Sequence, residues 1–371
     1  MKTILITGAN GFIGKNLRAS LMRLDDVNIL TFDSNDSLQL LSRHLKKADI
    51  VYHLAGVNRP DNIEYFETVN VGLTKKIVAI LENIGNRPTI VLSSSIQATL
   101  DNPYGISKRK AEDILIQYIK RYGVRAYIYR LPNVFGKWCK PNYNSVVATF
   151  CYNIAQGLDI TISDKNKELE LVYIDDVVHE FIGCLVLPDY CEDTVYCKVR
   201  RKHKITLGGL AKKIYQLRDI RSSLVIPDLA DDFTRCLHAT YLSYLDRDRL
   251  SYSLNVKTDY RGCLAELIKS RHFGQIFISK THEKVIRGNH YHDSKIEKFC
   301  VIQGQAIIKF RHVLNSEVLS YAVSGQNIEV VDIPPGYTHS IENVGEEEMI
   351  VIFWANQIFD PANPDTYYCE V

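Results

Sequence analysis

The start of the chain constrains the fold most, because three glycines there separate a short apolar strand from a helix. Residues 2–8, KTILITG, are an apolar run, and residues 11–24, GFIGKNLRASLMRL, have helical periodicity. Gly8, Gly11 and Gly14 form a G-x-x-G-x-x-G loop between them. Such glycines let the backbone approach a pyrophosphate at the positive end of the helix. The pattern predicts a dinucleotide-binding turn, although glycine turns also precede helices that bind nothing.

Two patterns of secondary structure follow one another along the 371 residues. Up to about residue 185, apolar strands alternate with helical stretches, which is typical of a doubly wound parallel sheet. From about residue 250, short strands are broken by Gly, Pro and Asn, which favours an antiparallel sandwich or barrel. The sequence therefore predicts an α/β Rossmann-type domain over residues 1–248 and an all-β domain over residues 249–371.

Charge and cysteine content bear on partners and compartment. The formal net charge of +2 gives no field that would attract nucleic acid or a membrane surface. No apolar run approaches the roughly 20 residues that span a bilayer, and no signal peptide is recognisable at the start. The nine cysteines are scattered without a Cys-x-x-Cys, which argues against disulfides and cysteine zinc sites. We therefore expect a cytoplasmic protein with no nucleic-acid or membrane partner.

A carboxylate near the glycine loop bears on the choice of cofactor. Asp33 ends the second apolar strand, about 20 residues after the loop, where it would accept hydrogen bonds from a ribose 2′-hydroxyl. This position favours NADH, because the carboxylate would repel the 2′-phosphate of NADPH. Taken alone, Asp33 is equally consistent with a solvated turn residue.

A tyrosine and a lysine four residues apart indicate proton transfer. Tyr104 and Lys108 lie on one face at the start of a helix. An ammonium beside a phenol lowers the phenol pKa, normally about 10, towards working pH. The phenol could then exchange a proton with a carbonyl while a nicotinamide exchanges the hydride. A bare Tyr-x-x-x-Lys is common on helix surfaces, but this one follows a serine-rich strand end, residues 93–95, that could orient the substrate oxygen.

Seven segments in order resemble the extended short-chain dehydrogenase/reductase superfamily. They are TGANGFIG, DIVYHLAG, VNVGLT, LSSS, YGISK, RLPNVFG and LVYIDDVV. The resemblance implies Tyr104 as proton donor, Lys108 as cofactor clamp and Ser95 (or Ser94) as the orienting hydroxyl. It also implies a nucleotide-sugar substrate, with Asn133 near it. The implied cofactor-binding residues are Gly8, Asn10, Gly11, Phe12, Ile13, Gly14, Asp33, Leu54, Ala55, Gly56, Asn70 and Lys108.

Three histidines and a glutamate in the second half form a metal-ligand pattern. Residues two apart in a strand point the same way, so His290 and His292 face one side. Glu297 follows after a turn, and His339 lies in PPGYTHSIEN. Three imidazoles and a carboxylate suit Zn²⁺ or another divalent transition metal. The first two histidines alone would also fit ordinary polar positions of a barrel.

The full spacing resembles the two halves of the cupin motif. His-x-His-x4-Glu-x6-Gly covers residues 290–304, and Pro-x-Gly-x2-His-x3-Asn covers residues 334–343. The resemblance implies a jelly-roll fold with His290, His292, Glu297 and His339 as the ligands. Lys284 stands where the first half usually has a glycine, and the stretch from Gly325 to Pro334 is longer than usual. Those glycines shape turns, so we expect the ligand set to be intact.

Two segments of the second half resemble metal-free deoxysugar 3,5-epimerases. DYRGCLAE and VIRGNHYH match the start and the catalytic strand of those enzymes, whose strand carries Arg-Gly-x-His-(Tyr/Phe)-Gln with the histidine as base. His292 stands at the glutamine position here, which favours a metal site. A metal-bound imidazole cannot take a proton, so the base stays open among a metal-bound water, Tyr291, Lys298 and Tyr337.

A 4-keto sugar nucleotide would connect the two chemistries. Its carbonyl acidifies the neighbouring C–H bonds, so a base could invert a centre while a metal stabilises the enolate. Epimerisation must come first, because reduction of the carbonyl removes that acidity. From end to end the chain resembles the bifunctional capsular-polysaccharide enzymes of UDP-N-acetyl-L-fucosamine synthesis. The matching segments are GVNRP, SSSIQAT, FGKWCKPNYNSV, TYLSYL, VVDIPPGYTH and FDPANPDTYYCEV.

That resemblance implies two reactions and a homodimer. The cupin domain would epimerise C3 of a UDP-2-acetamido-2,6-dideoxy-4-keto-hexose, and the first domain would reduce C4 with NADPH to UDP-N-acetyl-6-deoxy-L-talosamine. Asp33 conflicts with NADPH, so NADH stays open. One alternative is a non-catalytic dinucleotide sensor, against which Tyr104 and Lys108 count. The other is a 4-ketoreductase whose cupin domain is a non-catalytic, zinc-stabilised module for sugar binding or dimerisation, which the sequence leaves open.

Overall fold

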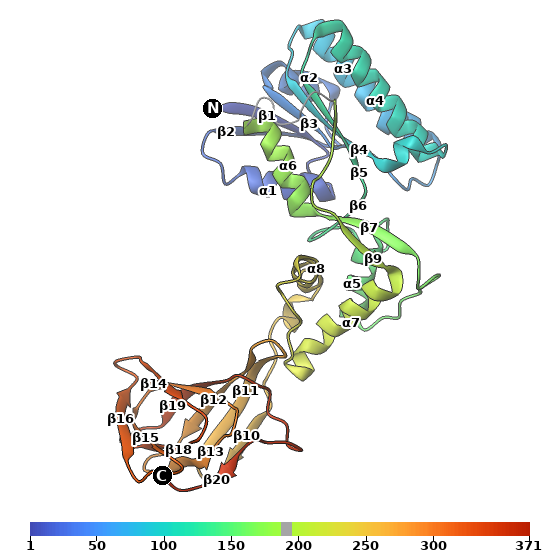
Figure 1. The fold of residues 1–371 in the computed structure, drawn as a ribbon. Coiled ribbons are helices and arrows are strands. Elements are labelled where there is room, and N and C mark those ends of the chain that lie inside the picture. Colours follow the sequence, from blue (N-terminus) through green and yellow to red (C-terminus); the bar gives the residue numbers. More distant parts are fainter. Residues whose placement is uncertain (187–194) are drawn as a thin grey trace. The chain divides into compact units, whose positions relative to one another are not determined.

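The computed structural model describes residues 1–186 and 195–371 and divides into two compact units (Figure 1). The first unit comprises Met1–Ile214 and Cys236–Leu245, and the second comprises Tyr215–Arg235 and Asp246–Val371. The expected boundary between residues 248 and 249 stays a prediction. Within the described ranges, no helix combines the length and apolarity that crossing a membrane requires.

A six-stranded sheet lies at the centre of the first unit, in the order β2-β1-β3-β4-β5-β8 with every neighbouring pair parallel. Its strands are β1 (Lys2–Thr7), β2 (Val27–Phe32), β3 (Ile50–His53), β4 (Thr89–Ser95), β5 (Ala126–Leu131) and β8 (Tyr196–Cys197). The α-helices that lie wholly within this unit are α1 (Phe12–Leu21), α2 (Leu38–Lys47), α3 (Gly72–Ile84), α4 (Pro103–Tyr122), α5 (Val146–Gln156) and α6 (Ile174–Val186). A small second sheet contains β6 (Asn133–Phe135), β7 (Glu168–Tyr173) and β9 (His203–Thr206).

Two apolar cores cover the two faces of the six-stranded sheet, because successive strand residues point to opposite faces. Ile4 and Ile6 of β1 belong to the core that includes Phe181 of α6, and α1 contributes to the same core. Leu5 belongs to the other core, with residues such as Leu81 of α3, and α2 and α4 contribute there. Figure 1 shows the two groups of helices on either side of the sheet. The predicted doubly wound arrangement is confirmed.

Cys197 at the edge of this sheet is disulfide-bonded. The expectation that the chain forms no disulfides is therefore wrong, because cysteine number and spacing in a sequence do not report which side chains meet in the fold. The predicted cytoplasmic location stays a prediction.

The second unit is a pair of antiparallel sheets around one core, as predicted for an all-β cupin-like domain. The sheet orders are β10-β11-β12-β19-β14-β17 and β16-β15-β18-β13-β20. Facing residues of both sheets form the core, for example Phe299 and Phe353 of the first and Ile308 and Ile341 of the second. The strands are β10 (Val256–Asp259), β11 (Gly262–Ser270), β12 (Gly274–Thr281), β13 (Ile286–Tyr291), β14 (Glu297–Gln303), β15 (Gln305–His312), β16 (Val318–Ser324), β17 (Val330–Ile333), β18 (Tyr337–Asn343), β19 (Met349–Ala355) and β20 (Tyr367–Tyr368). Helices α7 (Leu207–Ser223) and α8 (Asp232–Leu242) precede these strands in the chain.

Lys284, which stands where the cupin motif usually has a glycine, adopts a left-handed backbone conformation. Its φ is +58°, a left-handed value that costs a residue with a Cβ roughly 1–2 kcal/mol. Its amide donates to the carbonyl of Asn343 at 3.0 Å, which closes the turn before β13. The turn therefore closes with a lysine at this position, at the cost of a left-handed backbone.

Candidate active site and candidate metal centre

The glycine loop between β1 and α1 packs closely at two positions and is more open at the third. A Cβ on Gly8, whose φ is +72°, would lie 2.8 Å from the backbone of Ala55, and one on Gly14 would lie 2.2 Å from the Gly8 carbonyl oxygen. Gly11 is the N-cap of α1 and supplies no side-chain cap. The first amides of α1 therefore stay available to an anion, which fits a dinucleotide pyrophosphate.

Asn10 in this loop binds the carboxylate of Asp33. The Asn10 amide donates to Oδ1 at 3.1 Å, and its Nδ2 donates to Oδ2 at 2.9 Å. The sequence predicted both residues at the cofactor but not the contact between them. The contact holds the carboxylate beside the glycine loop, the position in which it would meet a ribose.

Asp33→Ala is expected to shift cofactor preference towards NADPH, whichever cofactor the parent prefers. The substitution removes a negative charge that would repel the 2′-phosphate. Titration of NADPH and NADH into parent and variant measures the ratio of the two dissociation constants. An unchanged ratio would show that Asp33 points away from the ribose.

The remaining predicted cofactor residues surround the same loop. Leu54, Ala55 and Gly56 directly follow β3. Asn70 is buried, and its side chain binds the backbone of Val57 while its Nδ2 also donates to the Ser107 hydroxyl at 3.0 Å. Phe12 and Ile13 pack against the core that contains α6. The structure thus brings these residues together, and their contact with a cofactor stays a prediction.

A buried histidine behind the loop was missed by sequence reasoning. His53 Nδ1 lies 2.8 Å from the Thr7 hydroxyl, and its Nε2 lies 2.9 Å from the Thr74 hydroxyl. Burial, with a smaller contribution from Lys108, lowers the pKa of His53 to about 3, so the ring is neutral. His53 thereby links the ends of β1 and β3 to α3. In the sequence, His53 ends the apolar strand within DIVYHLAG, and this position could have indicated a buried histidine.

Tyr104 and Ser95 meet where β4 ends and α4 begins. The Tyr104 phenol is half-buried, and the Ser95 side chain lies close enough to lower its pKa. The neighbouring Ser94 hydroxyl instead donates to Glu112. Glu112 is fully buried and pairs with Arg130, whose Nη2 lies 2.6 Å from Oε2. Of the two serines that the resemblance offered, Ser95 is therefore the one beside the phenol.

The pKa of Tyr104 differs from the expectation. Burial raises it, and the Ser95 side chain opposes this only in part. The Lys108 ammonium donates to the Ser93 carbonyl at 2.6 Å, and burial lowers the pKa of Lys108 to about 8. The prediction that Lys108 lowers the phenol pKa is therefore wrong for this structure. A raised pKa keeps the phenol protonated, which suits a proton donor.

Asn133, the predicted substrate neighbour, begins β6 and is exposed. Its Nδ2 lies 3.5 Å from the carbonyl of Glu170 on β7. Contact with a substrate stays a prediction.

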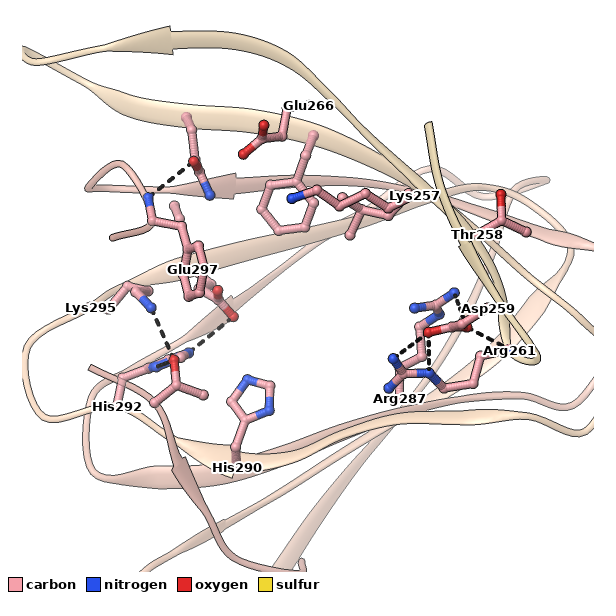
Figure 2. A pocket seen from close by; sticks show the side chains of 16 residues that line it. Lys257, Thr258, Asp259, Arg261, Glu266, Arg287, His290, His292, Lys295 and Glu297 are labelled. Atoms are coloured by element: carbon pink, nitrogen blue, oxygen red, sulfur yellow. Dashed lines mark hydrogen bonds and ion pairs between the residues drawn. The ribbon is translucent and has the colours of Figure 1, made fainter. Parts of the chain in front are cut away.

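In the second unit, the four predicted ligands lie together between the two sheets. One possible ligand atom from each lies within 4.8 Å of the others. His290 of β13 and His339 of β18 are cross-strand partners in one sheet, and Glu297 begins β14 of the other. His292 follows β13. Figure 2 shows His290, His292 and Glu297 converging at one end of a pocket.

The hydrogen bonds of two of these histidines fit a metal site. His292 Nδ1 bonds to the carbonyl of Asp365 at 2.5 Å, and His339 Nδ1 bonds to that of Tyr337 at 3.2 Å. Both rings are buried, yet neither Nε2 forms a hydrogen bond with any residue that the structure describes. Each Nε2 lies 3.3–3.4 Å from Glu297 Oε2. Ligating histidines are typically held in this way, with the second nitrogen on a carbonyl.

The charges of the cluster also fit a cation. Burial lowers the pKa of His290 to about 4, and the neighbouring histidines act in the same direction. Burial would raise the pKa of Glu297, but the adjacent side chains of His292 and His339 hold it well below its usual range. A neutral imidazole at His290 and an ionised carboxylate at Glu297 are the forms that bind Zn²⁺.

The pocket beside this cluster has a volume of about 390 Å³. Among the described residues, its lining includes none of the side chains named as candidate bases. Tyr291 packs against Tyr367, and Lys298 pairs with Asp332. The lining does include a buried lysine, Lys295, which sequence reasoning missed.

These features define a nucleotide-binding protein of the dehydrogenase class joined to a cupin-like domain with a candidate metal centre. Residues 4–189 match the family described as "NAD dependent epimerase/dehydratase family", and residues 257–367 match "Polysaccharide biosynthesis C-terminal domain". The chain belongs to the NAD dependent epimerase/dehydratase family. It also shares a narrower family with two relatives that it matches over nearly their whole length.

The first relative is the "UDP-2-acetamido-2,6-beta-L-arabino-hexul-4-ose reductase" of Pseudomonas aeruginosa, 42% identical over 99% of this chain and 98% of that protein. The second is the crystal structure of the capsular polysaccharide assembling protein CapF from Staphylococcus aureus. It is 45% identical with a TM-score of 0.93, covering 99% of this chain and 100% of that one. A UDP-glucuronic acid 4-epimerase from Bacillus cereus in complex with NAD, 16% identical with a TM-score of 0.56 over 65% of this chain and 98% of that one, shares the fold. The resemblance to capsular-polysaccharide enzymes is thus confirmed for the family.

Proposed function

We propose that the chain is a bifunctional nucleotide-sugar enzyme of capsular polysaccharide synthesis. The second unit epimerises C3 of a UDP-2-acetamido-2,6-dideoxy-4-keto-hexose, and the first reduces C4 with NADPH or NADH to UDP-N-acetyl-6-deoxy-L-talosamine. The reductase activity in the name of the Pseudomonas relative supports the reduction. The observation that carries the proposal is that one chain holds a Tyr104–Ser95 pair at the carboxyl end of the sheet that carries the glycine loop, and also a histidine–glutamate cluster in a pocket.

In the reduction, Ser95 and Tyr104 bind the C4 carbonyl oxygen. A bound nicotinamide cofactor would supply the hydride to C4. Tyr104 gives its proton to the oxygen, so the ketone becomes an alcohol and the phenolate is left to regain a proton. Lys108 is buried against the Ser93 carbonyl, and it would hold the ribose of the bound cofactor.

In the epimerisation, the second unit holds the ketone in an environment that stabilises its enolate. His290, His292, Glu297 and His339 would hold a Zn²⁺, which would supply Lewis-acid polarisation of the carbonyl. A base removes the C3 proton, and a proton is returned on the opposite face. Because the alcohol lacks acidified hydrogens, this step precedes the reduction. The cluster is assigned to metal binding only, and no residue is assigned as the base.

The far end of the same pocket carries two guanidinium groups that would hold the diphosphate of the substrate. Arg261 and Arg287 both line the pocket and lie on either side of Asp259 (Figure 2). Asp259 Oδ2 lies 2.6 Å from Arg261 Nη2, and Asp259 Oδ1 lies 4.0 Å from Arg287 Nη2. Two guanidiniums share one carboxylate, which leaves donors for phosphate oxygens. Lys257 adds a further cation to the lining.

Arg287→Ala is expected to weaken binding of the UDP-sugar to the second unit by roughly tenfold to a hundredfold, the range of hydrogen bonds to charged groups. Zinc content should stay at the parent level, because Arg287 does not contact the cluster. Calorimetric titration with UDP and metal analysis measure the two effects. Arg271→Ala removes an exposed arginine outside the pocket and is the control. Parent-like UDP affinity of Arg287→Ala would place the diphosphate elsewhere.

Product analysis tests the proposed function. The UDP-4-keto sugar is incubated with the full chain in D₂O, with and without NADPH. We expect deuterium at C3 without cofactor, and a reduced sugar with deuterium at C3 when cofactor is present. Reduction without deuterium exchange would instead support a ketoreductase with a non-catalytic cupin domain. The predicted homodimer is separate from this test and stays a prediction.

A further inference from the structure

The C-terminal tail, residues 359–371, lies along the strand that carries the first candidate ligand. Strand β20 of the tail pairs with β13, with Tyr368 opposite His290. The amide of Cys369 donates to the carbonyl of Asn289 at 3.0 Å. The tail therefore continues the sheet at the edge next to His290.

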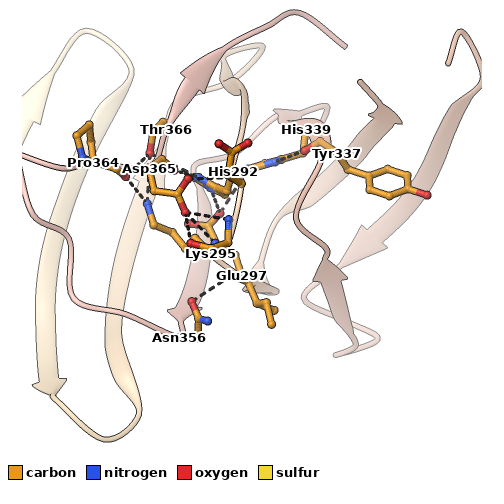
Figure 3. Close-up of polar contacts among 12 residues, drawn as sticks. His292, Lys295, Glu297, Tyr337, His339, Asn356, Pro364, Asp365 and Thr366 are labelled. Carbon is orange, nitrogen blue, oxygen red and sulfur yellow. Dashed lines mark hydrogen bonds and ion pairs between the residues drawn. The ribbon is translucent and has the colours of Figure 1, made fainter. Parts of the chain in front are cut away.

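One residue of the tail contacts the second ligand through its main chain. The Asp365 carbonyl bonds to His292 Nδ1 at 2.5 Å, so His292 Nε2 faces Glu297 (Figure 3). This bond fixes both the tautomer and the plane of the imidazole. Asp365 has a φ of +40°, a left-handed value that Asp and Asn adopt more readily than most residues.

The carboxylate of the same residue holds the loop between the ligands His292 and Glu297. It accepts four hydrogen bonds of 2.8–3.1 Å from that loop. The donors are the amides of Asp293, Ser294 and Lys295 and the hydroxyl of Ser294. Asp365 thus binds the loop at every residue from 292 to 295.

The tail is also part of the pocket wall. Phe359 and Thr366 line the pocket, and the ammonium of Lys295 donates to the Pro364 carbonyl at 2.8 Å and to the Thr366 hydroxyl at 3.2 Å. A displaced tail would therefore move one ligand and part of the substrate wall together.

We propose that Asp365 is a positioning residue of the metal centre, acting through His292 and the loop to Glu297. The inference rests on the proposed metal site. Asp365 would thus affect metal affinity without being one of the four candidate ligands. It lies 73 positions from His292 in the sequence.

Asp365→Asn is the sharpest test, because Asn tolerates the left-handed backbone but cannot accept all four bonds. The full-length protein is stripped of metal, and Zn²⁺ affinity is measured by competition with a chromophoric chelator. We expect affinity to fall by about 10- to 100-fold, the range for residues that orient metal ligands. Asp360→Asn makes the same charge change in the same tail, where the carboxylate accepts a hydrogen bond from the Ala362 amide at 2.9 Å, and should keep parent affinity.

A second readout separates positioning from general stability. The Co²⁺-loaded Asp365→Asn protein should have a ligand-field spectrum different from those of the parent and of Asp360→Asn, because His292 is displaced. Ser294→Ala removes one of the four bonds and should lower Zn²⁺ affinity by a smaller factor, which keeps the test valid if Asp365→Asn does not fold. Parent-like affinity and spectrum in a folded variant would overturn the role of Asp365. A parent that binds no Zn²⁺ would instead overturn the proposed metal site.

Discussion

Tyr104→Phe is expected to bind the nicotinamide cofactor nearly as tightly as the parent and to lose reduction by about 10²- to 10⁴-fold, the usual contribution of a general acid. The ring keeps its packing against Phe66, whose centroid lies 5.8 Å away, so only the hydroxyl is lost. Single-turnover oxidation of NADPH with the 4-keto sugar measures the chemical step, and fluorescence titration measures cofactor binding.

Two matched serine variants sharpen this test. Ser95→Ala removes the hydroxyl beside the phenol and should slow reduction, whereas Ser94→Ala removes the donor to Glu112. Ser94→Ala leaves the buried carboxylate of Glu112 with one hydrogen bond fewer. We therefore expect a lower free energy of unfolding and a smaller change in the rate of reduction than in Ser95→Ala. Lys108→Ala should lose both cofactor binding and reduction. Near-parent turnover by Tyr104→Phe would refute its assignment as the proton donor.

The sequence predicted the parts of both sites that are encoded locally. Gly8, Gly11 and Gly14 lie in one turn, and their spacing reflects steric needs that the structure shows directly. The histidine–glutamate cluster was predictable for a similar reason, because His290 and His292 lie around one strand end and fixed spacings relate the other ligands to it.

The parts that were missed depend on contacts between distant segments. Asn10 meets Asp33 at a separation of 23 residues, and Asp365 meets His292 at a separation of 73. No periodicity within one element encodes such pairs. The expectation for the pKa of Tyr104 was wrong for a related reason. The spacing of Tyr104 and Lys108 sets the helix face that they share, but burial and the carbonyl that takes the ammonium follow from the whole fold.

The second large effect is expected at the candidate metal centre, when the carboxylate of Glu297 is replaced by an amide. Glu297→Gln should lower deuterium exchange at C3 by about 10²-fold or more, the cost of losing a main electrostatic stabiliser of an oxyanion-like state. The substitution keeps the side-chain volume and one oxygen but removes the only negative charge among the four candidate ligands. Cofactor binding by the first unit should be unchanged, because Glu297 lies in the pocket of the second.

Metal analysis and thermal unfolding, read beside the exchange rate, distinguish a catalytic from a structural metal. A catalytic metal predicts lost exchange in a Glu297→Gln protein that is folded at the assay temperature. A structural metal predicts that the unfolding temperature falls as metal is lost, because binding to the native state adds stability. Glu266→Gln is the control, since that carboxylate also lines the pocket but pairs with Lys269 at 2.9 Å rather than with the cluster. Full metal content in His339→Ala would refute the ligand set, because the His339 ring is buried and its Nε2 faces Glu297.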